Sequence, residues 1–102
     1  MIRIMLVCND GMSTSYLAAK MQEIATARGL KVQIWAAPEH EIEEKQDTCD
    51  VILLGPQIGY MESSIRKWTG DKPLMTIAPI DYGRLNAEKV LDDALKLMEG
   101  RE

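Results

Sequence analysis

The sequence predicts an α/β fold in which a single four-stranded parallel sheet carries helices on both faces. Short apolar, strand-like segments alternate along the chain with segments whose apolar residues recur at helical spacing. The segment 51–54 is a continuous apolar run, which is typical of a strand buried on both faces of a parallel sheet. Strands connected through helices run parallel with right-handed crossovers, so the helices are distributed over both faces.

The first strand–helix unit occupies the N-terminal third of the chain. Residues 2–7 predict a strand, and residues 13–28 predict a helix that Gly29 ends. The residues at helical spacing in this segment are Leu17, Met21, Ile24, Ala25 and Arg28.

The second and third strands differ in their patterns. Residues 31–36 alternate between an apolar face and a more polar face, as a half-exposed edge strand does. Residues 39–46 are charged and weakly helical, and residues 51–54 form the buried third strand, which Gly55 and Pro56 end. The first and third strands are apolar and the second is amphipathic, so we expect the strand order 2-1-3-4, as in a small flavodoxin-like sheet.

The C-terminal part of the chain predicts two helices and the fourth strand. A helix over 60–69 would turn Met61, Ile65 and Trp68 inward, a strand follows at 74–78, and residues 79–83 are expected to form a loop. Asn86 can cap a last helix over 87–99, which Gly100 would end.

Length and composition limit the class of protein. The chain has 102 residues and a net charge of −4, which indicates one domain, residues 1–102, and argues against nucleic acid as a partner. Its longest apolar run is far shorter than the roughly 20 residues of a membrane span, and Asn9 and Asp10 interrupt the N-terminal apolar run, so we expect a monomeric cytosolic protein without membrane insertion. Cys8 and Cys49 form no CxxC pair, and nothing in the sequence indicates a metal or another cofactor.

The loop that follows the first strand has the composition of a phosphate site. Ligands of such sheets bind outside the carboxyl ends of the strands at the switch point between strands one and three, where Cys8 lies. The free amides and the positive dipole at a helix N-terminus stabilise an anion and also favour a thiolate. We therefore expect a phosphate on the Cys8 sulfur, held by the loop Asn9, Asp10, Gly11, Met12, Ser13, Thr14 and Ser15.

Other interpretations of this loop exist. Cys8 could be an unreactive buried residue in a binding module, and the loop could be a simple turn with a helix cap. The loop lacks the glycine patterns of nucleotide cradles. A thiol phosphatase or an arsenate-reductase-like enzyme would require an arginine where Thr14 stands, because a guanidinium binds the transferring phosphoryl group with two hydrogen bonds.

Two further residues carry a nucleophilic atom of a suitable kind. Cys49 precedes the third strand, so we expect it at the opposite end of the sheet from Cys8, about 17–20 Å away and beyond disulfide reach. His40 follows the second strand and could carry a phosphoryl group at the same edge, but its surroundings favour a solvated residue in a charged helix.

The segments "MLVCNDGMSTSYLAAKM", "VILLGPQIGYM" and "IAPIDYGRLNAEKVL" together resemble the enzyme IIB components of the sugar phosphotransferase system, of the lactose/cellobiose (chitobiose) type. The resemblance implies that Cys8 accepts a phosphoryl group from a phosphohistidine of enzyme IIA. It also implies that Cys8 passes this group to a β-disaccharide that enters through the membrane component, enzyme IIC.

Four polar residues follow the third and fourth strands. Gln57, Tyr60, Asp81 and Tyr82 are expected at the same edge as Cys8, in contact with its loop or with a partner protein. We expect Asp81 and Tyr82 to form part of the partner surface. The carboxylate of Asp10 should point away from the phosphate, since like charges repel there.

Overall fold

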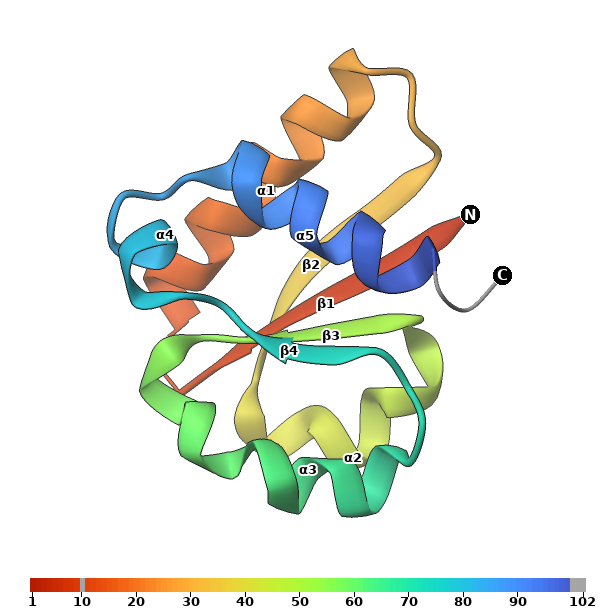
Figure 1. Cartoon of the computed structure of the whole chain (residues 1–102), viewed down its shortest axis with the longest axis vertical. Helices are drawn as coiled ribbons and strands as arrows, with labels where there is room; N and C mark the ends of the chain where they lie inside the picture. The colour runs from red at the N-terminus through yellow and green to blue at the C-terminus, as the bar shows by residue number, and fades with distance from the viewer. Residues whose placement is uncertain (10, 100–102) are drawn as a thin grey trace.

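The structure, a computed structural model, describes residues 1–9 and 11–99, with the backbone alone at Gly11 and Met12. Its four parallel strands are β1 (Ile2–Cys8), β2 (Val32–Pro38), β3 (Val51–Leu54) and β4 (Leu74–Thr76). They lie side by side in the order β2-β1-β3-β4, which confirms the predicted topology (Figure 1).

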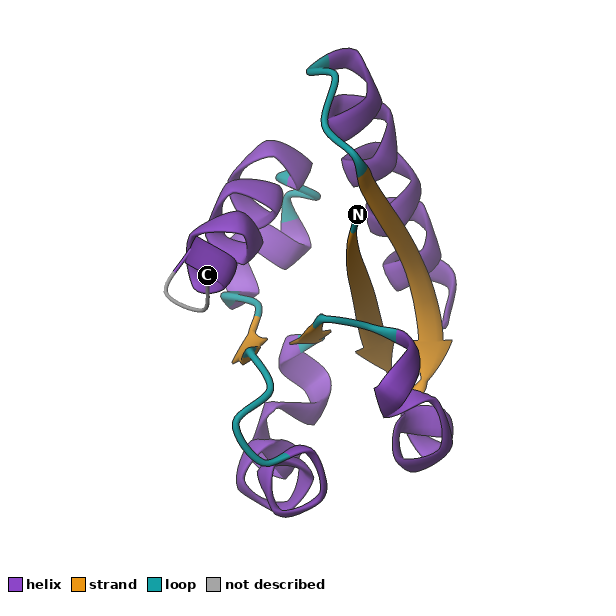
Figure 2. Cartoon of the chain, turned by 90° about the vertical axis from the view of Figure 1, so that its right-hand side faces the viewer, coloured by secondary structure: helices purple, strands orange, loops and turns teal. Residues whose placement is uncertain are grey.

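Helices cover both faces of this sheet. Helices α1 (Gly11–Ala27) and α5 (Ala87–Glu99) lie on one face, and α2 (Ile42–Lys45) and α3 (Glu62–Thr69) lie on the other (Figures 1 and 2). The short helix α4 (Pro79–Gly83) follows β4, and 3-10 turns occupy Glu39–Glu41, Gln46–Thr48 and Pro56–Met61.

The central strand β1 supplies side chains to two separate hydrophobic clusters. Ile4 and Leu6 pack with residues of α1 and α5, whereas Met5 and Val7 pack with Ile42 and other residues on the α2/α3 face. All four side chains are fully buried. Because successive side chains of a strand point to opposite faces, an uninterrupted apolar sequence fits a strand that is covered on both sides.

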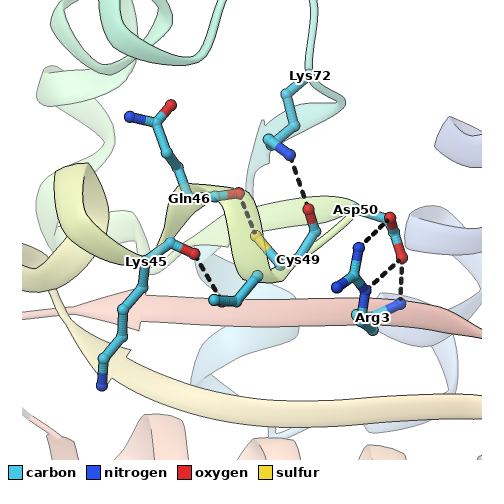
Figure 3. A network of polar contacts seen from close by, with 7 residues as sticks. Arg3, Lys45, Gln46, Cys49, Asp50 and Lys72 are labelled. Atoms are coloured by element: carbon cyan, nitrogen blue, oxygen red, sulfur yellow. Dashed lines mark hydrogen bonds and ion pairs between the residues drawn. The ribbon is translucent and has the colours of Figure 1, made fainter.

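Polar contacts fix the start of β1 relative to β3 (Figure 3). Arg3 donates to Asp50 from its backbone nitrogen (2.8 Å), from Nε (3.2 Å) and from Nη2 (3.1 Å), and Asp50 donates its backbone N–H to the carbonyl of Arg3 at 2.7 Å. The guanidinium of Arg3 lowers the pKa of Asp50, chiefly through these side-chain hydrogen bonds. The two strands are therefore aligned from their first residues.

Two helix boundaries agree with their sequence signals. Gly29, with φ +73°, follows α1 directly after Arg28 and adopts a conformation that glycine accepts without strain. The side chain of Asn86 accepts a hydrogen bond from the backbone of Lys89 at 3.4 Å and caps α5. The predicted end of that helix at Gly100 lies outside the described residues. No helix in the described part of the chain has the length and apolar character to cross a bilayer.

Several details of the sequence prediction were wrong. The predicted helix 60–69 begins as a 3-10 turn and becomes α-helical at Glu62, and Trp68 is 44% exposed rather than turned inward. The segment 79–83 is a helix, because Pro79 starts a turn that its fixed φ favours. Arg28 lies beyond α1 and donates to Asp92 at 2.7 Å on the surface.

Strand boundaries moved by one or two residues. β2 begins and ends later than predicted, at Val32 and Pro38, and Pro38 lies opposite Cys8 in the register with β1. β4 ends at Thr76 instead of residue 78, so Ile77 and Ala78 connect it to α4. The backbone N–H of Gly55 bonds to the carbonyl of Val7 at 2.8 Å, which brings the end of β3 against Cys8.

Candidate active site

Cys8 is the last residue of β1, and its side chain lies at the carboxyl edge of the sheet. The residue is 1% exposed. Its sulfur lies 3.5 Å from Asn9 Oδ1, 3.5 Å from Gln57 Oε1 and 3.9 Å from the hydroxyl of Tyr82. Polar groups from the β1–α1 connection, from the turn after β3 and from α4 therefore converge on one thiol, which the sequence placed at this edge.

Thr14 and Tyr82 form a buried hydroxyl pair behind the sulfur. Their oxygens are 3.0 Å apart, and the two residues are 1% and 8% exposed. Burial raises the pKa of the Tyr82 phenol, and the neighbouring Cys8 raises it further, against the opposing effect of the hydrogen bonds from Thr14 and Gln57. The phenol therefore retains its proton at neutral pH and can donate it toward the sulfur.

This burial contradicts the expectation that Tyr82 belongs to a partner surface. The fourth-strand connection folds into α4, and α4 carries the ring into the same hydrophobic cluster as α1 and α5. Asp81 is also largely covered, with 16% of its side chain exposed and its Oδ2 3.9 Å from Lys89 Nζ. Its carbonyl accepts the backbone N–H of Asn86 at 2.9 Å, which ties α4 to the start of α5.

Gly55 leaves the space that the site requires. A Cβ atom at this position would lie 3.1 Å from the Cys8 sulfur and 2.9 Å from Gln57 Oε1. From the sequence, Gly55 was expected only to form a turn. The close approach between β1 and the end of β3 depends on how the strands pair in the sheet, which local sequence does not specify. The usable signal was a glycine directly after a buried strand that pairs with the cysteine-bearing strand.

The N-terminus of α1, at Gly11, follows Cys8 closely in the chain. The helix begins at Gly11, so its first-turn amides have no intrahelical partners and its dipole is positive at this end. Ser13 and Ser15 are exposed in that first turn, whereas Thr14 faces inward to Tyr82. The predicted outward orientation of Asp10 falls outside the described residues, as does the side chain of Met12.

The other candidate residues lie apart from this cluster. Tyr60 is 80% exposed in the 3-10 turn after β3. His40 is in the 3-10 turn after β2, with 78% of its side chain exposed and its Nε2 4.0 Å from a Glu41 oxygen. No hydrogen bond or ion pair found among the described residues joins either side chain to Cys8.

Cys49 lies at the other end of the sheet, before β3, and is a free thiol like Cys8 (Figure 3). Its sulfur donates to the carbonyl of Gln46 at 3.5 Å, and Lys72 Nζ donates to the Cys49 carbonyl at 2.7 Å. Burial raises the pKa of the Cys49 thiol, which favours its protonated form.

The fold and the site together define a parallel α/β protein with a buried cysteine at the switch point of its sheet, beside a helix N-terminus. Residues 3–93 match the family described as PTS system, Lactose/Cellobiose specific IIB subunit, where PTS denotes the phosphotransferase system. The chain belongs to this family and is a phosphotransferase component. This agrees with the resemblance found in its sequence motifs.

Individual relatives match along almost the whole chain. The oligo-beta-mannoside-specific EIIB component of Bacillus subtilis is 36% identical, over 96% of this chain and 97% of that protein. The galactose-specific EIIB component of Lactococcus lactis subsp. cremoris is also 36% identical, over 93% and 94%. The solution structure of the cellobiose-specific IIB component of Borrelia burgdorferi superposes with a TM-score of 0.80 at 36% identity, and the match covers 97% of this chain and 93% of that one.

Proposed function

We propose that Cys8 carries the phosphoryl group, accepting it from a phosphohistidine of enzyme IIA and passing it to a sugar presented by the membrane component, enzyme IIC. The observation that carries this proposal is the position of the Cys8 sulfur, at the carboxyl edge of the central strand and next to the N-terminus of α1. The Tyr82 hydroxyl at 3.9 Å adds a neutral donor on the buried side. Such a setting stabilises a phosphate dianion on the sulfur.

Both transfers conserve protons and electron pairs. In the first, the sulfur attacks phosphorus in line with the P–N bond; the S–P bond forms, the P–N pair stays on the imidazole nitrogen, and the thiol proton moves to that nitrogen. In the second, the sugar hydroxyl oxygen attacks phosphorus, the S–P bond breaks, and the hydroxyl proton ends on the sulfur. Cys8 thus divides one transfer into two steps through a covalent intermediate.

The site favours transfer to a positioned acceptor over transfer to water. A thiol phosphatase binds the phosphoryl group with an arginine. Here Thr14 occupies the corresponding position, and its hydroxyl is hydrogen-bonded to Tyr82. The described contacts of the sulfur include neutral amides and a phenol, none of which is a strong general base for water. This is the main reason to prefer a carrier to a low-molecular-weight phosphatase or an arsenate-reductase-like enzyme.

The sugar is proposed from the relatives rather than from the site. The three similar proteins carry the names of an oligo-β-mannoside, galactose and cellobiose, and all are 36% identical to this chain. The oligo-β-mannoside and cellobiose names, with the lactose/cellobiose description of the family, favour a β-disaccharide of the cellobiose, chitobiose and lactose class, and we choose no single member. The carrier would act as a one-domain monomer in the cytoplasm, where the Cys8 thiol stays reduced between cycles.

Intact-mass analysis after incubation with phosphorylated enzyme IIA tests the proposal. The wild-type chain should gain the mass of one phosphoryl group. Cys8→Ser should not gain this mass, because a hydroxyl supplies almost no anionic nucleophile at neutral pH. Cys49→Ser and His40→Ala are the controls and should be phosphorylated normally. Phosphoryl uptake by Cys8→Ser at the wild-type rate would show that Cys8 is not the carrier, and His40 would be the next residue to test.

A further inference from the structure

We propose that Gln57 is a second catalytic residue, a side chain that covers the Cys8 sulfur and turns its terminal amide as the sulfur changes from thiol to thiolate to phosphothiol. The inference rests on the proposed carrier role of Cys8. The Cys8 sulfur is buried, yet a phosphoryl group from a partner protein would have to reach it.

Two exposed residues place amide oxygens against this buried atom. Asn9 Oδ1 and Gln57 Oε1 both lie 3.5 Å from the sulfur, although Cys8 itself is 1% exposed. Asn9 is part of the loop that would hold the phosphate. Gln57 reaches the sulfur from a different element, the 3-10 turn after β3, 49 residues further along the chain. Its exposed side chain therefore reaches from the surface to the buried nucleophile, where it also contacts the hydroxyl of Tyr82.

The local backbone gives Gln57 room for this position. The space beside Gly55 is filled by both the Cys8 sulfur and Gln57 Oε1, which a Cβ atom would approach to 3.1 Å and 2.9 Å. Ile58 behind Gln57 is fully buried and anchors the turn, and its N–H bonds to the Gly55 carbonyl at 3.0 Å. The base of the turn is thus held in place, and the Gln57 side chain extends from it to the Cys8 sulfur.

A primary amide suits every state of the sulfur. Its oxygen lies 3.5 Å from the sulfur and can accept the single S–H of the thiol, for which Asn9 Oδ1 at the same distance is the alternative acceptor. Rotation of the terminal torsion by about 180° presents the NH2 group, which can donate to a thiolate or to a phosphate oxygen. A carboxylate would accept from the thiol but repel both charged states, and an apolar side chain would cover the sulfur without donating to it.

Three substitutions separate the covering role from the donating role. Gln57→Ala should raise the rate at which iodoacetamide alkylates Cys8 several-fold, and it should lower phosphoryl uptake from phosphorylated enzyme IIA about tenfold, since a hydrogen bond to a charged group is lost. Gln57→Met keeps a cover of similar length without a donor, so alkylation should stay near the wild-type rate while uptake falls by a similar factor. Gln57→Glu should lower uptake further and should also slow alkylation.

Gln33→Ala is the matched control, because Gln33 is an exposed glutamine on β2, placed outside the contacts of Cys8. It should change neither rate. An unchanged alkylation rate in Gln57→Ala would show that Gln57 does not shield the sulfur. Normal phosphoryl uptake by Gln57→Met would show that transfer does not need a hydrogen-bond donor at this position. If the wild-type chain takes up no phosphoryl group, the carrier proposal itself fails, while the alkylation rates still decide whether Gln57 covers the sulfur.

Discussion

The buried hydroxyl pair of Thr14 and Tyr82 links two elements that are 68 residues apart in the chain. Each hydroxyl satisfies the other in a region that water does not reach, and the phenol also faces the Cys8 sulfur. At the level of single residues, the Tyr82 phenol thus connects the interior of the domain with the Cys8 sulfur. A substitution there should affect both stability and transfer.

Tyr82→Phe keeps the ring and removes this hydroxyl. We expect the free energy of unfolding to fall by about 1–2 kcal/mol at neutral pH, because Thr14 keeps a buried hydroxyl without its partner. Phosphoryl uptake should also fall. Urea unfolding and intact-mass kinetics measure the two effects, and an unchanged unfolding free energy would show that Thr14 finds another partner.

The same substitution has a pH dependence. The pKa of Tyr82 is raised in the folded state, so folding holds this proton more tightly than the unfolded chain does. The contribution of Tyr82 to the free energy of unfolding is complete below the pKa of tyrosine in the unfolded chain, about 10. It is lost as the pH rises through the pKa of Tyr82 in the folded state. The stability advantage of the wild-type chain over Tyr82→Phe should therefore shrink above pH 10, and a constant advantage would contradict the raised pKa.

Gly55→Ala tests the space beside the sulfur. The added Cβ would meet the Cys8 sulfur at 3.1 Å and Gln57 Oε1 at 2.9 Å, so we expect a loss of about 1–3 kcal/mol in unfolding free energy and slower phosphoryl uptake. Gly83→Ala in α4 is the control, because a Cβ atom added there would meet nothing within 4 Å. Equal behaviour of the two variants would mean that the site adapts to the added methyl group.

At the scale of elements, α3 shows how one helix can bury one side chain and leave its neighbour on the next turn exposed. Ile65 is fully buried against the α2/α3 face, whereas Trp68, three residues later, is 44% exposed. Ile65→Ala should cost about 2–5 kcal/mol of unfolding free energy, since it opens a cavity. Trp68→Ala should cost less than about 1 kcal/mol, and a larger loss would show that the indole supports the core.

Elements with a strong local pattern could be predicted from the sequence. The run Val51–Leu54 and the periodic helix Ala87–Glu99 were placed at their observed bounds, and the difference between apolar and amphipathic strands indicated the strand order. These features depend on residues close together in the chain. The partial exposure of Trp68 depends on where α3 meets its neighbours, which helical spacing alone does not specify.

In the candidate site, too, local features could be predicted from the sequence and long-range contacts could not. The position of Cys8 at a strand end follows from local sequence, and so does the helix that begins after the loop. The contacts of Gln57 and Tyr82 with its sulfur join residues 49 and 74 positions apart. Proline and glycine around Tyr82 indicated a loop, and a single sequence contains no sign that the loop would become a helix with its ring turned inward.

At the scale of the whole molecule, the two ends of the sheet differ in character. The carboxyl edge carries the Cys8 cluster and, after β3 and β4, two exposed apolar side chains, Tyr60 at 80% and Ile80 at 60%. The opposite edge holds the structural contacts of Arg3, Asp50 and Cys49 (Figure 3). If Cys8 is the phosphoryl carrier, as proposed, its donor would meet the carboxyl edge of the sheet, and we expect the partner surface there.

Tyr60→Ala and Ile80→Ala together should slow phosphoryl uptake severalfold and leave the melting temperature within about 2 °C of the wild-type value, since both side chains are exposed. Trp68→Ala, on the other side of the molecule, should leave uptake unchanged. Normal uptake by the double variant would place the partner surface elsewhere on the chain.

The central position of the first strand has a consequence for how the chain folds. β1 pairs with β2 and β3, and the partners Ile4 and Val51 are 51 − 4 = 47 residues apart. Each pairing requires the closure of a long segment of chain before its contacts form, which costs entropy and slows folding. During synthesis β1 and β2 can associate first, and the apolar edge of β1 stays unpaired until β3 has emerged, so this edge is where a nascent chain is most open to aggregation.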